Sequence, residues 1–158
     1  MPHDTHVSDQ FVHDYGEAYH QFGLPRLMGH IVAVLLTEAE IQSLDDITGR
    51  LQVSKGPVSQ VMRRLRDHGL VEKRWVPGSR RDHYRATPDI FGQAFANHAA
   101  LQNQNLALAR KYNDLIPAAG EQPPPSFAQR MEEMERFYRL MSKHFKNFLD
   151  EWEATRGQ

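Results

Sequence analysis

One face of an expected helix beginning after Ser54 carries side chains that can recognise a nucleic acid. The apolar residues of this segment follow the spacing of a core-facing helix side: Val58, Val61, Met62 and Leu65. At 3.6 residues per turn, the opposite face then consists of polar or small residues: Gly56, Gln60, Arg63 and Asp67, flanked by Ser59 and Arg64. Arginine binds guanine through two hydrogen bonds, and glutamine can do the same with adenine. We therefore expect this face to read base edges in a major groove.

The start of the same helix has the chemistry to hold a phosphate. Ser54 precedes the helix, and we expect its hydroxyl to cap the amide of Gly56. Pro57 is tolerated at this point because first-turn amides have no partner within the helix. Amides left free at a helix start can bind a phosphate.

A basic hairpin is expected directly after this helix. Leu70–Val76 and Arg81–Ala86 have strand patterns around Pro77-Gly78, a dipeptide that favours a type II turn, although a longer loop also fits. Arg80 and Arg81 lie at the hairpin tip, where they can reach a minor groove. On spacing alone, an ordinary amphipathic helix with a hydrated polar face is the better explanation of the preceding helix. The order of helix, turn, helix and basic hairpin, however, favours a DNA-binding helix over this explanation.

The charge distribution also favours a nucleic-acid partner. The 158-residue chain has a formal net charge of −1, yet Arg50–Arg85 contains ten basic and only three acidic residues, a local balance of +7. The rest of the chain therefore carries −8. A strongly basic segment in a chain of nearly zero net charge is typical of a surface that binds phosphates. A solvated basic face without a partner is an alternative.

The elements that must position these residues are mainly helices with one small β-hairpin. This pattern predicts an α+β fold, a winged helix-turn-helix with a dimerisation helix at each end. The expected divisions are an N-terminal dimerisation helix (1–23), a DNA-binding domain (24–87) and a C-terminal helical dimerisation region (88–158).

Caps and glycines predict where the helices begin, end and meet. Ser8 is expected to start the first helix, and Gly29 to be a point of close backbone contact in the second. Ser43 with Asp46 resembles a capping box for a short third helix. Of the two helices after the hairpin, the first is expected to begin at Thr87. The second is expected to begin at Ser126, which forms a second capping box with Gln129.

Five segments together resemble the GbsR-type branch of the MarR superfamily: residues 24–31 (LPRLMGHI), 43–47 (SLDDI), 53–59 (VSKGPVS), 65–71 (LRDHGLV) and 78–84 (GSRRDHY). The resemblance covers residues 20 to 115. It implies a homodimeric bacterial or archaeal regulator, often a repressor, on a pseudo-palindromic operator. It also implies which residues contact DNA. Together with Gly56 at the expected helix start, the candidate DNA contacts are Ser54, Lys55, Gly56, Ser59, Gln60, Arg63, Arg64, Arg80 and Arg81. The wing departs from the common pattern because Asp82 follows Arg81, whereas the family's aspartate precedes its arginine.

A wide apolar seam runs along the last helix, with alternating spacings of four and three: Phe127, Met131, Met134, Tyr138, Met141, Phe145, Phe148 and Trp152. It can pack on the chain's own first helix, on the same helix of a second subunit, or on both. MarR-like dimers interlock their terminal helices, so we expect dimer contacts at Phe11, Tyr15, Tyr19, Met134, Tyr138, Met141, Phe145, Phe148 and Trp152.

The resemblance also suggests a small-molecule effector, because GbsR-type proteins are associated with the handling of choline and compatible solutes. Aromatic rings can cage a quaternary ammonium. The candidates are Phe11, Tyr15, Tyr19, Trp75, Tyr138 and Trp152. Core packing explains the same residues more simply.

Other classes of protein find little support. The chain has no cysteine, no glycine-rich phosphate loop, no nucleophile elbow and no paired histidines with helical zinc spacing, so we expect neither an enzyme nor a bound metal or cofactor. The longest apolar run, Ile31–Leu36, is too short to cross a membrane, and we expect a cytoplasmic protein. The alternative function is a winged helix that contacts protein or RNA without binding an operator.

Overall fold

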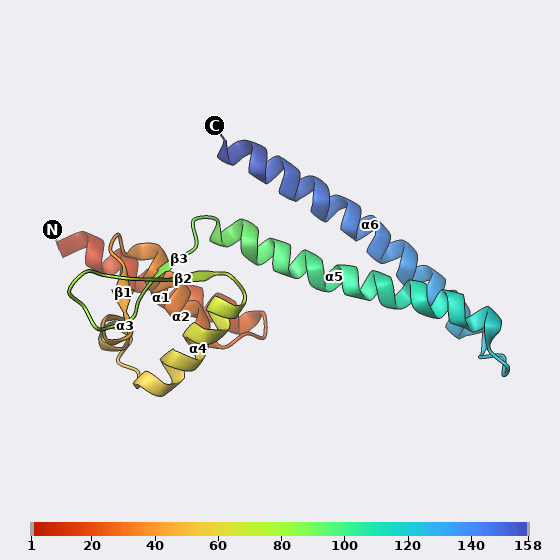
Figure 1. The fold of residues 1–158 in the computed structure, drawn as a ribbon, viewed down its shortest axis with the longest axis horizontal. Coiled ribbons are helices and arrows are strands. Elements are labelled where there is room, and N and C mark those ends of the chain that lie inside the picture. The colour runs from red at the N-terminus through yellow and green to blue at the C-terminus, as the bar shows by residue number, and fades with distance from the viewer. Residues whose placement is uncertain (1, 158) are drawn as a thin grey trace. The chain divides into compact units, whose positions relative to one another are not determined.

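The computed structural model describes residues 2–157, which form six α-helices and a small antiparallel sheet (Figure 1). This confirms the predicted class, a mainly helical winged helix-turn-helix. The elements are α1 (Pro2–Gln21), α2 (Arg26–Thr37), β1 (Gln42–Ser43), α3 (Leu44–Leu51), α4 (Lys55–Asp67), β2 (Val71–Arg74), β3 (His83–Ala86), α5 (Ile90–Leu115), a 3-10 turn (Ile116–Ala118) and α6 (Pro125–Arg156). The chain divides into two compact units, residues 1–90 and 91–158.

In the first unit, α1 packs against α2 at glycines. A Cβ on Gly29 would lie 2.8 Å from the Tyr15 carbonyl oxygen and 2.9 Å from the Gly16 Cα, so only glycine fits there. The predicted close contact at Gly29 is therefore confirmed. Sequence analysis missed Gly16, which lies directly under the His30 ring. The expected start of α1 at Ser8 is wrong, because the helix begins at Pro2, where proline is tolerated in a first turn.

The helix-turn-helix consists of α3 and α4. The Ser43 hydroxyl accepts from the Asp46 amide at 3.1 Å, and the Ser43 amide donates to Asp46 Oδ2 at 2.8 Å, which confirms the capping box. The hydrogen bond from the Ser43 side chain holds the pKa of Asp46 below its usual value. Val58, Met62 and Leu65 of α4 are at most 2% exposed and pack in one core with residues of α2 and α3. The predicted inward face of α4 is confirmed at these positions.

The wing belongs to a sheet of three strands with the order β1-β3-β2. Tyr84 of β3 lies opposite Lys73 of β2 on one side and Gln42 of β1 on the other. Sequence analysis missed β1, because a strand of two residues leaves no alternating pattern. The predicted turn is present: the Ser79 amide donates to the Val76 carbonyl at 3.1 Å, and Gly78 has φ +80°. The strands are shorter than predicted, so residues 75–82 form a longer loop.

Two further predicted helix starts, those of α5 and α6, are wrong. The helix expected from Thr87 begins at Ile90, and the Thr87 hydroxyl donates instead to the Gly69 carbonyl at 2.7 Å. The last helix begins at Pro125 without a side-chain cap, so Ser126 already lies inside its first turn. Both residues have the side chain of a helix cap. The Thr87 hydroxyl binds a different partner, however, and α6 begins one residue before Ser126.

The second unit is a pair of long helices, α5 and α6, that run alongside each other (Figure 1). The Phe95 ring of α5 lies 4.9 Å from the Phe145 ring and 4.5 Å from the Phe148 ring of α6. Near the connecting turn, the Asn113 side chain donates to Glu135 Oε2 at 2.6 Å. The apolar seam of α6 thus packs on α5, a partner that sequence analysis did not consider.

Candidate nucleic-acid interface

The outer face of α4 presents the predicted base-reading side chains together. Gln60, Arg63 and Arg64 are exposed, and Ser59 is half-buried beside them. Within residues 2–157, no ion pair holds the guanidinium of Arg63 or Arg64. These side chains are therefore free to form new hydrogen bonds on a groove floor.

The start of α4 differs from the prediction. Ser54 is the N-cap residue, but its side chain makes no capping hydrogen bond to the helix. Pro57, at the third helical position, lacks one of the two amides that such a serine can bind, and the Gly56 amide expected as its partner is not bound either. Gly56 is exposed, and the space that a Cβ would occupy there is empty. The surface of this first turn is accordingly open to an incoming group.

The wing approaches the start of α4 through a residue that sequence analysis missed. Asp45, in the first turn of α3, lies 3.1 Å from Lys55 Nζ and 3.2 Å from Arg81 Nη1. Asp82 pairs with Lys73 of β2 at 2.7 Å instead. The arginine of this wing is thus held by an aspartate from another element. No local signal could have shown this, because Asp45 and Arg81 are far apart in sequence.

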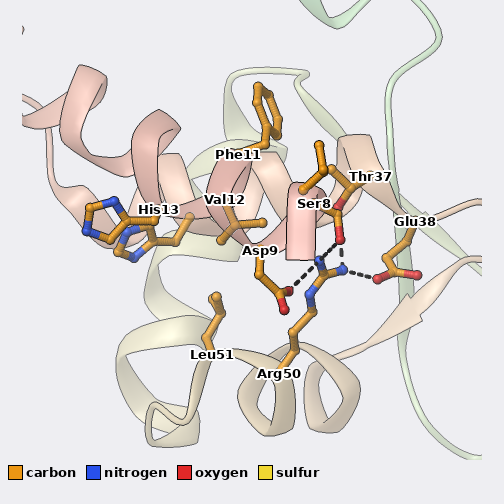
Figure 2. Close-up of a pocket in the computed structure, with 11 residues that line it drawn as sticks. Ser8, Asp9, Phe11, Val12, His13, Thr37, Glu38, Arg50 and Leu51 are labelled. Carbon is orange, nitrogen blue, oxygen red and sulfur yellow. Dashed lines mark hydrogen bonds and ion pairs between the residues drawn. The ribbon is translucent and has the colours of Figure 1, made fainter. Parts of the chain in front are cut away.

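A second missed feature is a pocket of about 1080 Å³ between α1 and the ends of α2 and α3. Figure 2 shows Arg50 at its floor, reaching Asp9 on one side and Glu38 on the other. Arg50 Nη2 also lies 3.2 Å from Ser8 Oγ. Arg50 is a basic residue inside the predicted DNA-binding segment, yet its side chain connects α3 to α1 and α2 within the domain.

The candidate cage aromatics of the first unit do not come together as a set. Phe11, Tyr15 and Tyr19 form a row along α1 with ring centroids 5.2 Å apart at each step. Tyr15 and Tyr19 are half-buried against the core, and this burial raises the pKa of Tyr19 to about 12. Trp75 is 80% exposed in the wing loop, and no ring contact among residues 2–157 joins it to that row.

Some of the predicted dimer residues of the last helix make contacts within their own chain. Phe145 and Phe148 contact Phe95 of α5, and the rest of the set is half-buried: Met134, Tyr138, Met141 and Trp152. Apolar side chains flanking this seam stay more than half exposed, with Phe137 at 55% and Leu140 at 58%. A large apolar surface therefore remains on the second unit.

The fold and the basic outer face of α4 define a winged helix-turn-helix DNA-binding protein. Residues 29–89 match the family of winged helix DNA-binding domains. The chain is 27% identical to the HTH-type transcriptional repressor OpcR of Bacillus subtilis (strain 168) over 127 residues, which are 75% of this chain and 68% of OpcR. It is 27% identical to the HTH-type transcriptional regulator MmpR5 of Mycobacterium tuberculosis (strain ATCC 25618 / H37Rv) over 154 residues, which are 94% of this chain and 88% of MmpR5.

A crystal structure of a transcriptional regulator matches with a TM-score of 0.78 and 25% identity, covering 94% of this chain and 99% of that one. The similarity thus extends from the winged helix to the terminal helices. The chain is a DNA-binding transcriptional regulator. None of the helices described between residues 2 and 157 is both long and apolar enough to cross a membrane.

Proposed function

We propose that the chain regulates transcription as a homodimer that binds a pseudo-palindromic operator in double-stranded DNA. The observation that carries the proposal is the polarity of α4. Val58, Met62 and Leu65 are buried, whereas Gln60 and Arg63 are exposed, and no ion pair among residues 2–157 holds the Arg63 guanidinium. In a helix-turn-helix this is the helix that enters the major groove. A protein-binding helix would instead expose apolar anchors.

The DNA contacts are assigned by position on this surface. Gln60 and Arg63 lie centrally on the outer face of α4 and are proposed to read bases, with Ser59 and Arg64 beside them. Ser54, Lys55 and Gly56 at the helix start are proposed to hold a phosphate. Arg80 and Arg81 of the wing loop are proposed to reach the flanking minor groove. The winged helix of this proposal comprises residues 24–87.

The homodimer is proposed from the apolar surface left on the second unit. The pair of helices exposes four large apolar side chains, those of Leu101, Leu108, Phe137 and Leu140. Exposed apolar patches of this kind mark sites of protein–protein contact. Residues 88–158 and the first helix (1–23) are the proposed dimerisation segments, with the aromatic row of α1 included. A dimer would place two recognition helices about one DNA turn apart, as a two-fold operator requires.

The proposed mode of action is repression within the GbsR-type branch of the MarR superfamily. The sequence segments quoted above support this assignment, and the relative OpcR is named as a repressor. A small-molecule effector of the osmolyte or quaternary ammonium class remains a prediction from the resemblance. Binding of chromosomal DNA would place the protein in the cytoplasm.

The function is tested by selecting bound duplexes from a random pool at physiological salt. We expect enrichment of a two-fold symmetric motif, because each subunit of a dimer presents the same reading helix. Affinity for the selected duplex should fall steeply with salt, since several phosphates are neutralised on binding. The absence of any enrichment from the duplex pool would contradict the proposal.

Arg80→Ala is expected to weaken binding to all duplexes alike. Arg80 is exposed in the wing loop, and a phosphate or minor-groove contact carries little sequence information. The slope of log affinity against log salt should decrease by about 1. Fluorescence anisotropy titrations with the selected duplex and a random duplex measure both effects. Arg136→Ala, which removes the same charge from an exposed position on α6, is the matched control and should leave the slope unchanged.

Leu140→Glu is expected to dissociate the proposed dimer. Leu140 is 58% exposed on α6, and a carboxylate there would have to enter the subunit interface without a partner. Sedimentation velocity should give twice the 18.3 kDa chain mass for the wild type and a shift to the monomer for the variant. Asn147→Glu adds the same charge to an exposed polar position of the same helix and should stay dimeric. A monomeric wild type at micromolar concentration would exclude the dimer.

A further inference from the structure

The Asp45 carboxylate holds one cation from each of the two elements that the proposed function assigns to DNA. Its Oδ1 lies 3.1 Å from Lys55 Nζ at the start of α4, and its Oδ2 lies 3.2 Å from Arg81 Nη1 in the wing loop. Asp45, Lys55 and Arg81 are all exposed to solvent. A group arriving from solution can therefore reach all three side chains.

The surroundings of this carboxylate form a notch that suits an anion. The notch has a volume of about 260 Å³ and is lined by Ser43, Leu44, Asp45, Lys55, Arg80, Arg81 and Asp82. Its second carboxylate, Asp82, pairs with Lys73 at 2.7 Å. Asp45 is thus the anion that Lys55 and Arg81 share in the absence of DNA.

A DNA phosphate has the same chemistry as this carboxylate. Both present anionic oxygens, and lysine and arginine bind both with the same N–H donors. The notch joins the start of α4 to the wing, and these two elements contact the duplex in the proposed function. A backbone phosphate approaching this junction would meet Lys55 and Arg81 already placed around an anion.

We propose that Lys55 and Arg81 form one phosphate-binding site, and that Asp45 occupies this site until a DNA phosphate displaces it. The inference rests on the proposed function, because it describes a binding step of the same surface. Asp45 acts as a positioning residue: it keeps the two cations together and competes with every phosphate. The cost of displacement is independent of base sequence, because a phosphate contact carries no sequence information directly.

Asp45→Asn is therefore expected to tighten binding. The amide keeps the size of the side chain but no longer competes as an anion. Since exposed ion pairs are weak individually, the expected gain is about threefold to tenfold. The gain should be equal for a duplex selected by the wild type and for a random duplex. The salt slope should become steeper, because no freed carboxylate takes up a cation when DNA binds.

The experiment compares five chains by fluorescence anisotropy over a range of salt concentrations: wild type, Asp45→Asn, Asp82→Asn, a Lys55→Gln/Arg81→Gln background, and Asp45→Asn in that background. Asp82→Asn makes the same charge change at the same notch but releases Lys73, so its gain should be smaller. In the double-glutamine background the gain should vanish, because Asp45 then has no cation to release. Circular dichroism would verify folding, and the Ser43–Asp46 capping box is untouched by these changes.

Three results would overturn the inference while leaving the proposed function intact. These are weaker binding by Asp45→Asn, a gain no larger than that of Asp82→Asn, or a gain that persists without Lys55 and Arg81. The last result would mean simple long-range repulsion between Asp45 and DNA. A wild-type chain that binds no duplex in a salt-dependent way would overturn the proposed function and this inference together.

Discussion

Arg63→Ala is expected to weaken binding to the selected operator by about 1–3 kcal/mol, roughly fivefold to 150-fold. Arg63 lies centrally on the exposed face of α4, one turn after Gln60. The loss should concentrate at one base step, because arginine reads guanine through two hydrogen bonds to a single base. Anisotropy titrations against a set of single-base operator variants would show the preference at that step disappear, while discrimination at the other steps stays.

Arg63→Lys is the matched control for this prediction. Lysine keeps the positive charge but lacks the planar pair of donors that binds guanine bidentately. The lysine variant should therefore lose most of the base preference while keeping the salt slope of the wild type. If Arg63→Ala bound every operator variant as tightly as the wild type does, α4 could not be the reading element of this protein.

Gly29→Ala is expected to lower the free energy of unfolding of the first unit by about 1–3 kcal/mol, because it overpacks the contact between α1 and α2. The added Cβ would lie 2.8 Å from the Tyr15 carbonyl oxygen and 2.9 Å from the Gly16 Cα. These are backbone atoms, so the strain cannot be relieved by rotating a side chain. The two helices must move apart, and the packing of Val12 and Ile31 in the core should loosen with them.

Gly49→Ala makes the same chemical change with the opposite expected sign. Gly49 lies inside α3, and nothing lies within 4 Å of the position its Cβ would take. Alanine there should stabilise the chain by up to about 1 kcal/mol, because it restricts the unfolded backbone and favours the helix. Urea unfolding followed by circular dichroism measures both variants. Equal stabilities for the two alanine variants would show that the α1–α2 contact yields more easily than the structure indicates.

Features that depend on neighbouring residues were predictable from the sequence. The spacing of Val58, Met62 and Leu65 predicted which side of α4 is buried. Ser43 and Asp46, three residues apart, predicted a capping box that is present. Pro77 and Gly78 predicted the turn in the wing loop. In each case the residues involved are at most seven positions apart, so residue types and spacing were enough to predict the feature.

Local reasoning was wrong where a residue had a choice of partners. Ser54 and Thr87 both have the side chain of a helix cap, yet Ser54 makes no capping bond and the Thr87 hydroxyl donates to Gly69. Pro57, at the third position of α4, lacks an amide that Ser54 could otherwise cap. The Gly69 carbonyl, just after α4, accepts the hydrogen bond of the Thr87 hydroxyl. A hydroxyl pairs with the acceptor that the folded chain brings nearest, and sequence spacing does not reveal that acceptor.

The sequence alone thus determined the inward and outward sides of the recognition helix, because a periodic apolar pattern can bury only one face. Only the tertiary structure decided which distant charges meet. Asp45 joins Lys55 to Arg81, and Arg50 joins α3 to Asp9 and Glu38. It also decided that the α6 seam packs on α5. These contacts join residues far apart along the chain, and their distances depend on how whole helices pack, which no local pattern encodes.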